Sequence, residues 1–171
     1  DEGDAMIIKA LAGGGGRGMR LVTRSEELAQ AYERCRSEAL QAVGRADVYV
    51  ERFLPRARHI EVQVAGDGSG AVVHMGEREC SIQRRHQKIV EIAPCPSLSA
   101  ALRRCIADDA VRLAQAVAYD SLGTFEFLVD DAARDKVSKT AGKDAAAAAD
   151  ASAAADPFRT YAFLEVNPRL Q

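Results

Sequence analysis

The densest set of chemically useful side chains lies between Gly76 and Pro94, in the run G-E-R-E-C-S-I-Q-R-R-H-Q-K-I-V-E-I-A-P. Ile82 is the one large apolar residue between Glu77 and Lys88. Arginine and lysine neutralise phosphate or bicarbonate, while glutamine and histidine fix polar groups by hydrogen bonds. Composition alone therefore leaves two interpretations open, a site for a polyanion and a charged surface loop.

A glycine-rich stretch near the start of the chain has a second pattern that suits phosphate binding. The segment 12–22 reads A-G-G-G-G-R-G-M-R-L-V, between a strand expected at Ala5–Ala10 and another at Arg20–Val22. Backbone amides of glycines can approach an anion closely. A P-loop is excluded because Met19, and not lysine, follows the last glycine. A flexible linker is less favoured, since such linkers carry serine in place of arginine.

Two carboxylates and an amide near the end of the chain suit a hard cation. We expect strands over Thr124–Val129 and Thr160–Gln171, with Phe163, Glu165 and Asn167 alternating onto one face of the second. Pairing the two strands places Glu126 beside Glu165 and Asn167. Oxygen ligands of this kind favour Mg²⁺, although two exposed glutamates on a sheet would give the same spacing.

The elements that position these groups can be read from periodicity. Thr23–Glu26 is a capping-box pattern for a helix to about Val43, which Gly44 ends. A strand follows over Val48–Phe53. The buried face of the helix is expected to contain Leu28, Ala31, Cys35, Ala39 and Ala42.

A hairpin and a second helix are expected in the middle of the chain. Arg58–Ala65 alternates, a glycine-rich turn covers 66–70, and 71–75 returns as the partner strand. The polar face of the first strand contains His59, Glu61 and Gln63. Ser99 is expected to cap a helix to about Tyr119, and Leu122 and Gly123 to end the following turn. The buried stripe of that helix is expected to be Leu102, Ile106, Ala110, Leu113 and Val117.

Composition limits the class of protein. The 171 residues are 47% hydrophobic and carry a net charge of −2, which argues against nucleic acid and membrane partners. The four cysteines have no metal-ligand spacing, which indicates free thiols in the cytoplasm or an organellar matrix. The segment 131–159 is a low-complexity insertion, rich in alanine, aspartate and lysine, and is expected to be dispensable.

Several runs of this chain resemble biotin carboxylases of the ATP-grasp family. E-R-E-C-S-I-Q-R-R-H-Q-K is similar to the family signature, and K-A-L-A-G-G-G-G-R-G-M is similar to its glycine-rich lid. Y-V-E-R-F-L, F-E-F-L and F-L-E-V-N-P-R-L-Q also match. The resemblance implies an α+β ATP-grasp fold with mostly antiparallel sheets and flanking helices. It divides the chain into a partial lid subdomain, 1–52, and a partial catalytic subdomain, 53–171.

The resemblance also implies roles for individual residues. The implied ATP-binding residues are Lys9, Gly13, Gly14, Gly15, Gly16, Arg17, Gly18, Met19, Glu51, Arg52, Leu54, His59, Gln83, His86 and Leu128. The implied metal ligands are Glu126, Glu165 and Asn167, and the residues implied to hold bicarbonate are Lys88, Arg169 and Gln171.

The activity implied by the resemblance is ATP-dependent carboxylation of biotin with bicarbonate, through carboxyphosphate. ATP, bicarbonate, biotin and Mg²⁺ (or Mn²⁺) are the expected ligands. A biotinylated carrier domain, a carboxyltransferase and a second copy of the complete domain are the expected partners. The run G-E-R-E-C-S-I-Q-R-R-H favours an acyl-CoA or urea carboxylase. In the family, the residues that follow the position of Gln171 include the general base, so this segment alone is expected to be inactive. Another ATP-grasp carboxylate–amine ligase and a non-catalytic remnant are the alternatives.

Overall fold

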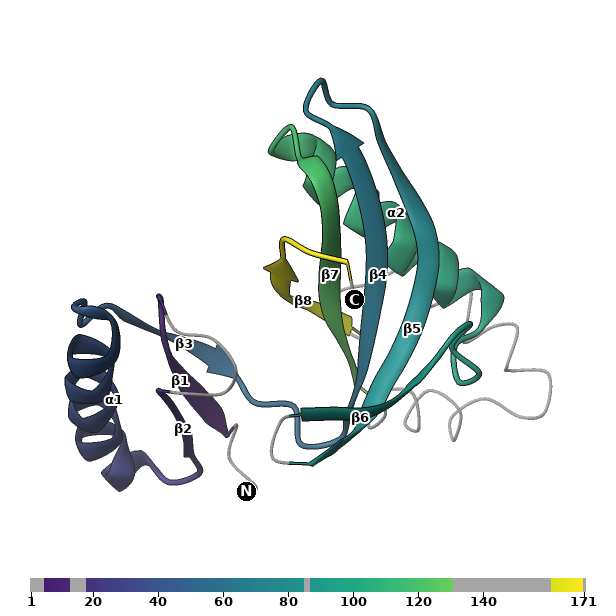
Figure 1. Ribbon diagram of the computed structural model, residues 1–171. Coiled ribbons are helices and arrows are strands. Elements are labelled where there is room, and N and C mark those ends of the chain that lie inside the picture. Colours follow the sequence, from purple (N-terminus) through teal and green to yellow (C-terminus); the bar gives the residue numbers. More distant parts are fainter. Residues whose placement is uncertain (1–4, 13–17, 85–86, 131–160, 171) are drawn as a thin grey trace, which may run out of the picture. The chain divides into compact units, whose positions relative to one another are not determined.

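The computed structural model describes residues 5–12, 18–84, 87–130 and 161–170 (Figure 1). Within them the chain forms two compact units that divide between Pro55 and Arg56, and Gln87 falls with the first unit. Each unit has its own sheet and its own helix. Among the described residues, no helix has the length and apolar character that crossing a membrane requires.

The first unit is a three-stranded antiparallel sheet covered by one helix. Its strands are β1 (Met6–Ala10), β2 (Met19–Val22) and β3 (Val48–Arg52), in the order β2-β1-β3. The helix α1 (Leu28–Val43) packs on this sheet through the buried residues Ile8, Val22 and Cys35. These strands match the expected ones to within a residue or two.

Residues next to α1 determine where the helix begins and ends, but only the end at Gly44 is as predicted. Gly44 ends the helix in the left-handed conformation, with φ of 72°, and its N–H donates to the Leu40 carbonyl at 2.9 Å. The predicted capping box at Thr23 is wrong: a 3₁₀ turn, η1 (Ser25–Glu27), precedes the helix, and no described side chain caps either element. Arg24 instead pairs with Glu27, its side-chain Nε lying 3.0 Å from the carboxylate.

The predicted buried face of α1 is also too long. Cys35 and Ala39 are buried and Ala31 is half-buried, whereas Leu28 and Ala42 are exposed. The covering sheet has only three short strands, so it contacts the middle turns of the helix.

The second unit is a five-stranded sheet in the order β6-β5-β4-β7-β8. Its strands are β4 (Ala57–Asp67), β5 (Val72–Arg84), β6 (Gln87–Ile92), β7 (Asp120–Asp130) and β8 (Tyr161–Asn167). The described part of the polar run from Gly76 lies on β5 and β6, so these residues do not form a surface loop. Leu122 and Gly123 lie inside β7 and not in a turn, because β7 starts four residues earlier than predicted.

The helix α2 (Ala100–Ala116) covers one face of this sheet (Figure 1). Ser99 caps it as predicted, its hydroxyl accepting from the Leu102 N–H at 3.2 Å. The predicted stripe is correct at Leu102, Ile106 and Ala110, but Leu113 and Val117 are exposed. The small residues Ala107 and Ala114 are buried instead, which lets the helix lie close to the sheet.

The core of the second unit packs on one face of the sheet, and the alternation of side chains then determines which residues lie on the other face. Its apolar residues from β4 and β7 are Ile60, Val62, Val64, Phe125, Phe127 and Val129. Side chains alternate between faces along a strand. The intervening residues of β4 and β7 therefore share the face opposite α2, and that face carries the candidate site.

Candidate functional site

Four charged residues form a row across the open face of the second sheet. Arg78 on β5 lies directly opposite Glu61 on β4, Glu61 lies opposite Glu126 on β7, and Glu126 lies opposite Glu165 on β8. Direct cross-strand partners have side chains on the same face, about 5 Å apart at Cβ. The predicted pairing of Glu126 with Glu165 is therefore present.

A β-bulge decides which β8 side chains join this row. Phe127 pairs with Phe163 while Glu126 pairs with Glu165, so Leu164 is an extra residue between them. The expectation that Phe163 shares a face with Glu165 and Asn167 is wrong for this reason. The Phe163 ring instead packs against Phe127, with ring centroids 5.7 Å apart.

Lys88 reaches from β6 into the row of acids. Its ammonium contacts Glu61 and lies 2.8 Å from Glu126 Oε1. Glu61 is fully buried and Glu126 is 3% exposed. The residue expected to hold bicarbonate thus lies between two carboxylates that water barely reaches.

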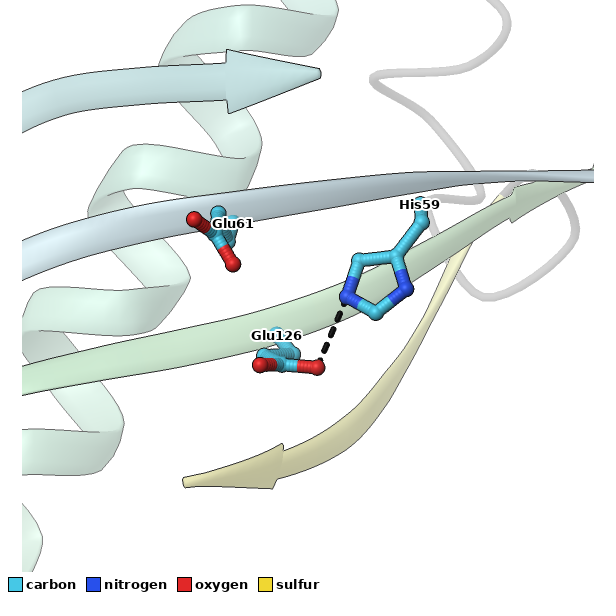
Figure 2. Close-up of side chains that lie close together, drawn as sticks. All are labelled: His59, Glu61 and Glu126. Atoms are coloured by element: carbon cyan, nitrogen blue, oxygen red, sulfur yellow. Dashed lines mark ion pairs between the residues drawn. The ribbon is translucent and has the colours of Figure 1, made fainter. Parts of the chain in front are cut away.

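His59 and Gln83 extend the same cluster toward the end of β4. His59 Nε2 lies 2.7 Å from Glu126 Oε2, and Gln83 Nε2 lies 3.0 Å from His59 Nδ1. Figure 2 shows His59 and Glu61 from β4 and Glu126 from β7 converging on one space. Leu128 is the cross-strand partner of His59, so three of the expected nucleotide contacts (His59, Gln83 and Leu128) lie together.

The cluster fixes the charge states of its two central groups. Burial would raise the pKa of the Glu126 carboxyl, but His59 and Lys88 outweigh it and lower that pKa to about 2. Burial alone would lower the pKa of the Lys88 ammonium, but the hydrogen bonds that it donates to Glu126 and Glu61 reverse the effect and raise that pKa. At neutral pH Glu126 is a carboxylate and Lys88 is a cation.

By residue type, Glu126, Glu165 and Asn167 offer the oxygen ligands that the implied Mg²⁺ would need. The Asn167 amide bridges the two carboxylates, with Nδ2 lying 2.7 Å from Glu126 Oε1 and 3.5 Å from Glu165 Oε1. Carboxylate and amide oxygens are ligands that Mg²⁺ accepts. His59, Glu61 and Glu126 also place ligand atoms within 4.8 Å of one another, and the Lys88 ammonium contacts both carboxylates of that group.

Two residues of the cluster had no predicted role. Alternation placed Glu61 on the same face as His59, and Arg78 lay within the polar run, yet neither was assigned. Arg78 Nε donates to Glu61 Oε1 at 2.8 Å, and its Nη2 lies 3.4 Å from Gln63 Oε1. Only the cross-strand register, which joins residues 17 positions apart, reveals this pair.

Arg169 contacts residues beside the row with its backbone atoms. Its carbonyl accepts from Thr124 Oγ1 at 3.1 Å and its N–H donates to the Asn167 carbonyl at 2.8 Å, while the residue is exposed. Gln171 and His86 lie outside the described residues.

The remaining predicted nucleotide contacts belong to the first unit. Lys9 on β1 forms an ion pair with Glu51 on β3, and Met19 is the cross-strand partner of Lys9. Gly18 precedes β2 with φ of 69°. Arg52 ends β3, and Leu54 is half-buried just after it. Gly13, Gly14, Gly15, Gly16, Arg17 and the predicted insertion at 131–159 lie outside the described residues, and β7 ends at Asp130, just before that insertion.

The chain matches the family model described as the carbamoyl-phosphate synthase L chain, ATP binding domain, over residues 2–140. It is 48% identical to the pyruvate carboxylase of Aspergillus niger over 169 residues, which are 99% of this chain and 12% of that protein. It is 54% identical to the mitochondrial pyruvate carboxylase of Homo sapiens over 128 residues, 75% of this chain and 11% of that protein. The chain thus spans about an eighth of the length of these relatives.

Solved structures give the same result for the fold. A biotin carboxylase from Campylobacter jejuni in a β-γ-ATP complex matches with a TM-score of 0.78 and 41% identity, covering 99% of this chain and 32% of that one. The biotin carboxylase domain of 2-oxoglutarate carboxylase from Hydrogenobacter thermophilus, in complex with MgADP, ADP and bicarbonate, matches with a TM-score of 0.76 and 38% identity, again over 99% and 32%. The predicted α+β ATP-grasp fold is confirmed.

Proposed function

The chain belongs to the family of carbamoyl-phosphate synthase L chain ATP-binding domains, and on that premise we propose that it is the central part of a biotin carboxylase. The proposed reaction uses ATP to activate bicarbonate as carboxyphosphate, whose CO₂ is passed to biotin. The observation that carries the proposal is the position of Lys88 between two buried carboxylates, beside the acid pair Glu126 and Glu165.

The charge balance of the cluster suits anionic substrates. Arg78 and Lys88 supply two positive charges against the three carboxylates of Glu61, Glu126 and Glu165. Mg²⁺ held by Glu126, Glu165 and Asn167 would make this face positive and would neutralise charge on the phosphates of ATP. The protein's own part is to keep a fixed cation and two fixed acids at the place where the reacting groups meet.

Lys88 acts in this proposal as a cation and not as a base. Its pKa is raised by Glu126 and Glu61, so it stays protonated at neutral pH. A protonated lysine can bind bicarbonate and stabilise charge on the attacking oxygen. Removal of the bicarbonate proton then requires another group.

The first unit supplies a separate set of proposed contacts. The Lys9 ammonium would bind ATP phosphates, and Glu51, Arg52 and Leu54 would lie near the adenine. The glycines 13–16 and Gly18, with Arg17 and Met19, would form the lid. The other proposed nucleotide contacts are His59, Gln83, His86 and Leu128, with Arg169 and Gln171 joining Lys88 at bicarbonate.

The final acceptor is proposed to be a 2-oxo acid such as pyruvate. The sequence motif alone favoured an acyl-CoA or urea, but the relatives found include pyruvate carboxylases and a 2-oxoglutarate carboxylase. Measuring carboxylation of pyruvate, acetyl-CoA and urea by the full-length protein decides between them. The biotinylated carrier, the carboxyltransferase, a homodimer of the complete domain, and a cytoplasmic or organellar-matrix location remain proposals.

The test is bicarbonate-dependent ATP cleavage by the full-length protein, with Lys88→Met as the variant. We expect a loss of about 100-fold or more, the size seen when one stabilising group is removed. The control is Arg103→Met, which removes a cation from Glu77 on the α2 side of the sheet, at an Nε–Oε1 distance of 2.7 Å. That variant should lose stability and keep its turnover.

Three results would contradict the proposal. ATP cleavage that does not depend on bicarbonate would favour another ATP-grasp ligase. No ATP cleavage by the wild type would favour a non-catalytic remnant. Full activity of Lys88→Met would show that Lys88 does not bind bicarbonate in the reaction.

A further inference from the structure

Arg78 is a nearly buried arginine at the end of the charged row, and the proposed reaction gives it no role. Its side chain is 16% exposed and stands opposite Glu61 across β5 and β4. Its Nε lies 2.8 Å from Glu61 Oε1, and a longer contact of 3.7 Å joins it to Glu91 Oε2. Its closest carboxylate is the fully buried one.

Glu61 divides its two oxygens between two cations. Oε1 accepts from Arg78 and Oε2 accepts from Lys88. A buried carboxylate needs counter-charge on both oxygens, because no water is available to solvate a free one. Arg78 therefore leaves only one Glu61 oxygen for Lys88.

Lys88 is in turn shared between Glu61 and Glu126. If Arg78 were absent, the whole charge of Glu61 would face Lys88, and the ammonium would move toward β4 and away from Glu126. Glu61 thus links Arg78 to Lys88.

Arg78 is itself held at a second point. Its Nη2 lies 3.4 Å from Gln63 Oε1, while Gln63 Nε2 donates to the Gly123 carbonyl at 2.8 Å. Thr124 Oγ1 also lies 3.2 Å from Gln63 Oε1. The planar guanidinium meets Glu61 and Gln63 in a fixed orientation, which a lysine cannot reproduce.

We propose that Arg78 is a positioning residue that sets the location of the Lys88 ammonium by occupying one oxygen of Glu61. This proposal rests on the proposed function, in which Lys88 meets bicarbonate. Removing Arg78 should then impair the use of bicarbonate much more than the binding of ATP.

The test uses the full-length protein with Arg78→Met and Arg78→Lys. In Arg78→Met we expect kcat/KM for bicarbonate to fall about 100-fold, the cost of misplacing a reacting group by about 1 Å. The KM for ATP should stay within about twofold of wild type. Arg78→Lys should recover part of the loss, because it keeps the charge and loses the second contact.

Glu91→Gln is the matched control. It removes the other carboxylate near Arg78, which is 39% exposed, and leaves the Glu61 contact in place. Its kinetic constants should equal those of the wild type. Circular dichroism of each variant confirms the fold, and if Arg78→Met does not fold, Arg78→Lys carries the test through its smaller, bicarbonate-specific loss.

The outcomes separate this proposal from the function on which it rests. If Lys88→Met loses bicarbonate-dependent ATP cleavage but Arg78→Met does not, only the role of Arg78 is refuted. Equal effects of Arg78→Met on ATP and bicarbonate, or an Arg78→Lys no better than Arg78→Met, also refute it. Full activity of Lys88→Met refutes the proposed function first.

Discussion

Glu126 gives the sharpest test of the charge cluster, because its stabilising effect must depend on pH. The carboxylate is 3% exposed and contacts Lys88 and His59. Replacing it by glutamine keeps the size of the side chain and removes the charge. We predict that Glu126→Gln destabilises the domain strongly at pH 7 and less in acid.

The size of the effect follows from the pKa of the carboxyl group. Folding lowers that pKa from 4.5 to about 2. A lowered pKa means that the ionised form stabilises the folded state, fully above pH 4.5 and progressively less as the pH falls toward 2. The difference corresponds to about 3 kcal/mol at neutral pH and about 2 kcal/mol at pH 3.5.

The assay is urea unfolding of the isolated biotin carboxylase domain, followed by circular dichroism at pH 7 and pH 3.5. Glu165→Gln is the matched control, since Glu165 is the exposed cross-strand partner of Glu126. An exposed carboxylate contributes about 1 kcal/mol or less, so the control should differ little from wild type at either pH. Equal slopes of the unfolding free energy against urea would show that the comparison is valid.

Two results would refute this reasoning. An equal loss of stability at both pH values would mean that Glu126 is not held as a buried carboxylate. Equal losses for Glu126→Gln and Glu165→Gln would mean that burial within the row does not matter.

Three further predictions concern the metal, a close contact and a helix cap. In the full-length protein, Glu165→Gln should lower bicarbonate-dependent turnover by about 100-fold with the fold intact, and unchanged turnover at saturating Mg²⁺ would contradict the metal assignment. Gly123→Ala should cost about 1–3 kcal/mol in urea unfolding, because a Cβ there would lie 2.3 Å from the Tyr119 hydroxyl oxygen; wild-type stability would show that the ring moves freely. Ser99→Ala should cost about 1 kcal/mol through loss of the bond from the Leu102 N–H, and Ser99→Asp, which also caps, should restore it.

Local signals in the sequence were sufficient for most of the elements. Alternation predicted β4 and placed His59 on its polar face, and the cap at Ser99 predicted where α2 starts. The order of residues in the motif runs was enough to name an ATP-grasp biotin carboxylase. These predictions succeeded because strand alternation, capping and family motifs are properties of neighbouring residues.

The errors have two physical causes, competition between local structures and packing between distant elements. The capping box at Thr23 competed with a 3₁₀ turn, and Leu113 faces solvent because small alanines bring α2 close to the sheet. Phe163 turned to the other face because of the bulge at Leu164. The outcomes at Leu113 and Phe163 depend on packing between elements distant in sequence, which local propensity does not specify.

The sequence by itself determined the residue types of the site and the pairing of Glu126 with Glu165. Only the tertiary structure decided that Glu61 is fully buried, that Arg78 stands opposite it, and that Lys88 lies between two acids. Burial sets how strongly charges interact, because the effective dielectric falls as water is excluded. A sequence lists the charges, but the packing of five strands on one helix sets the distances between them and their exposure to water.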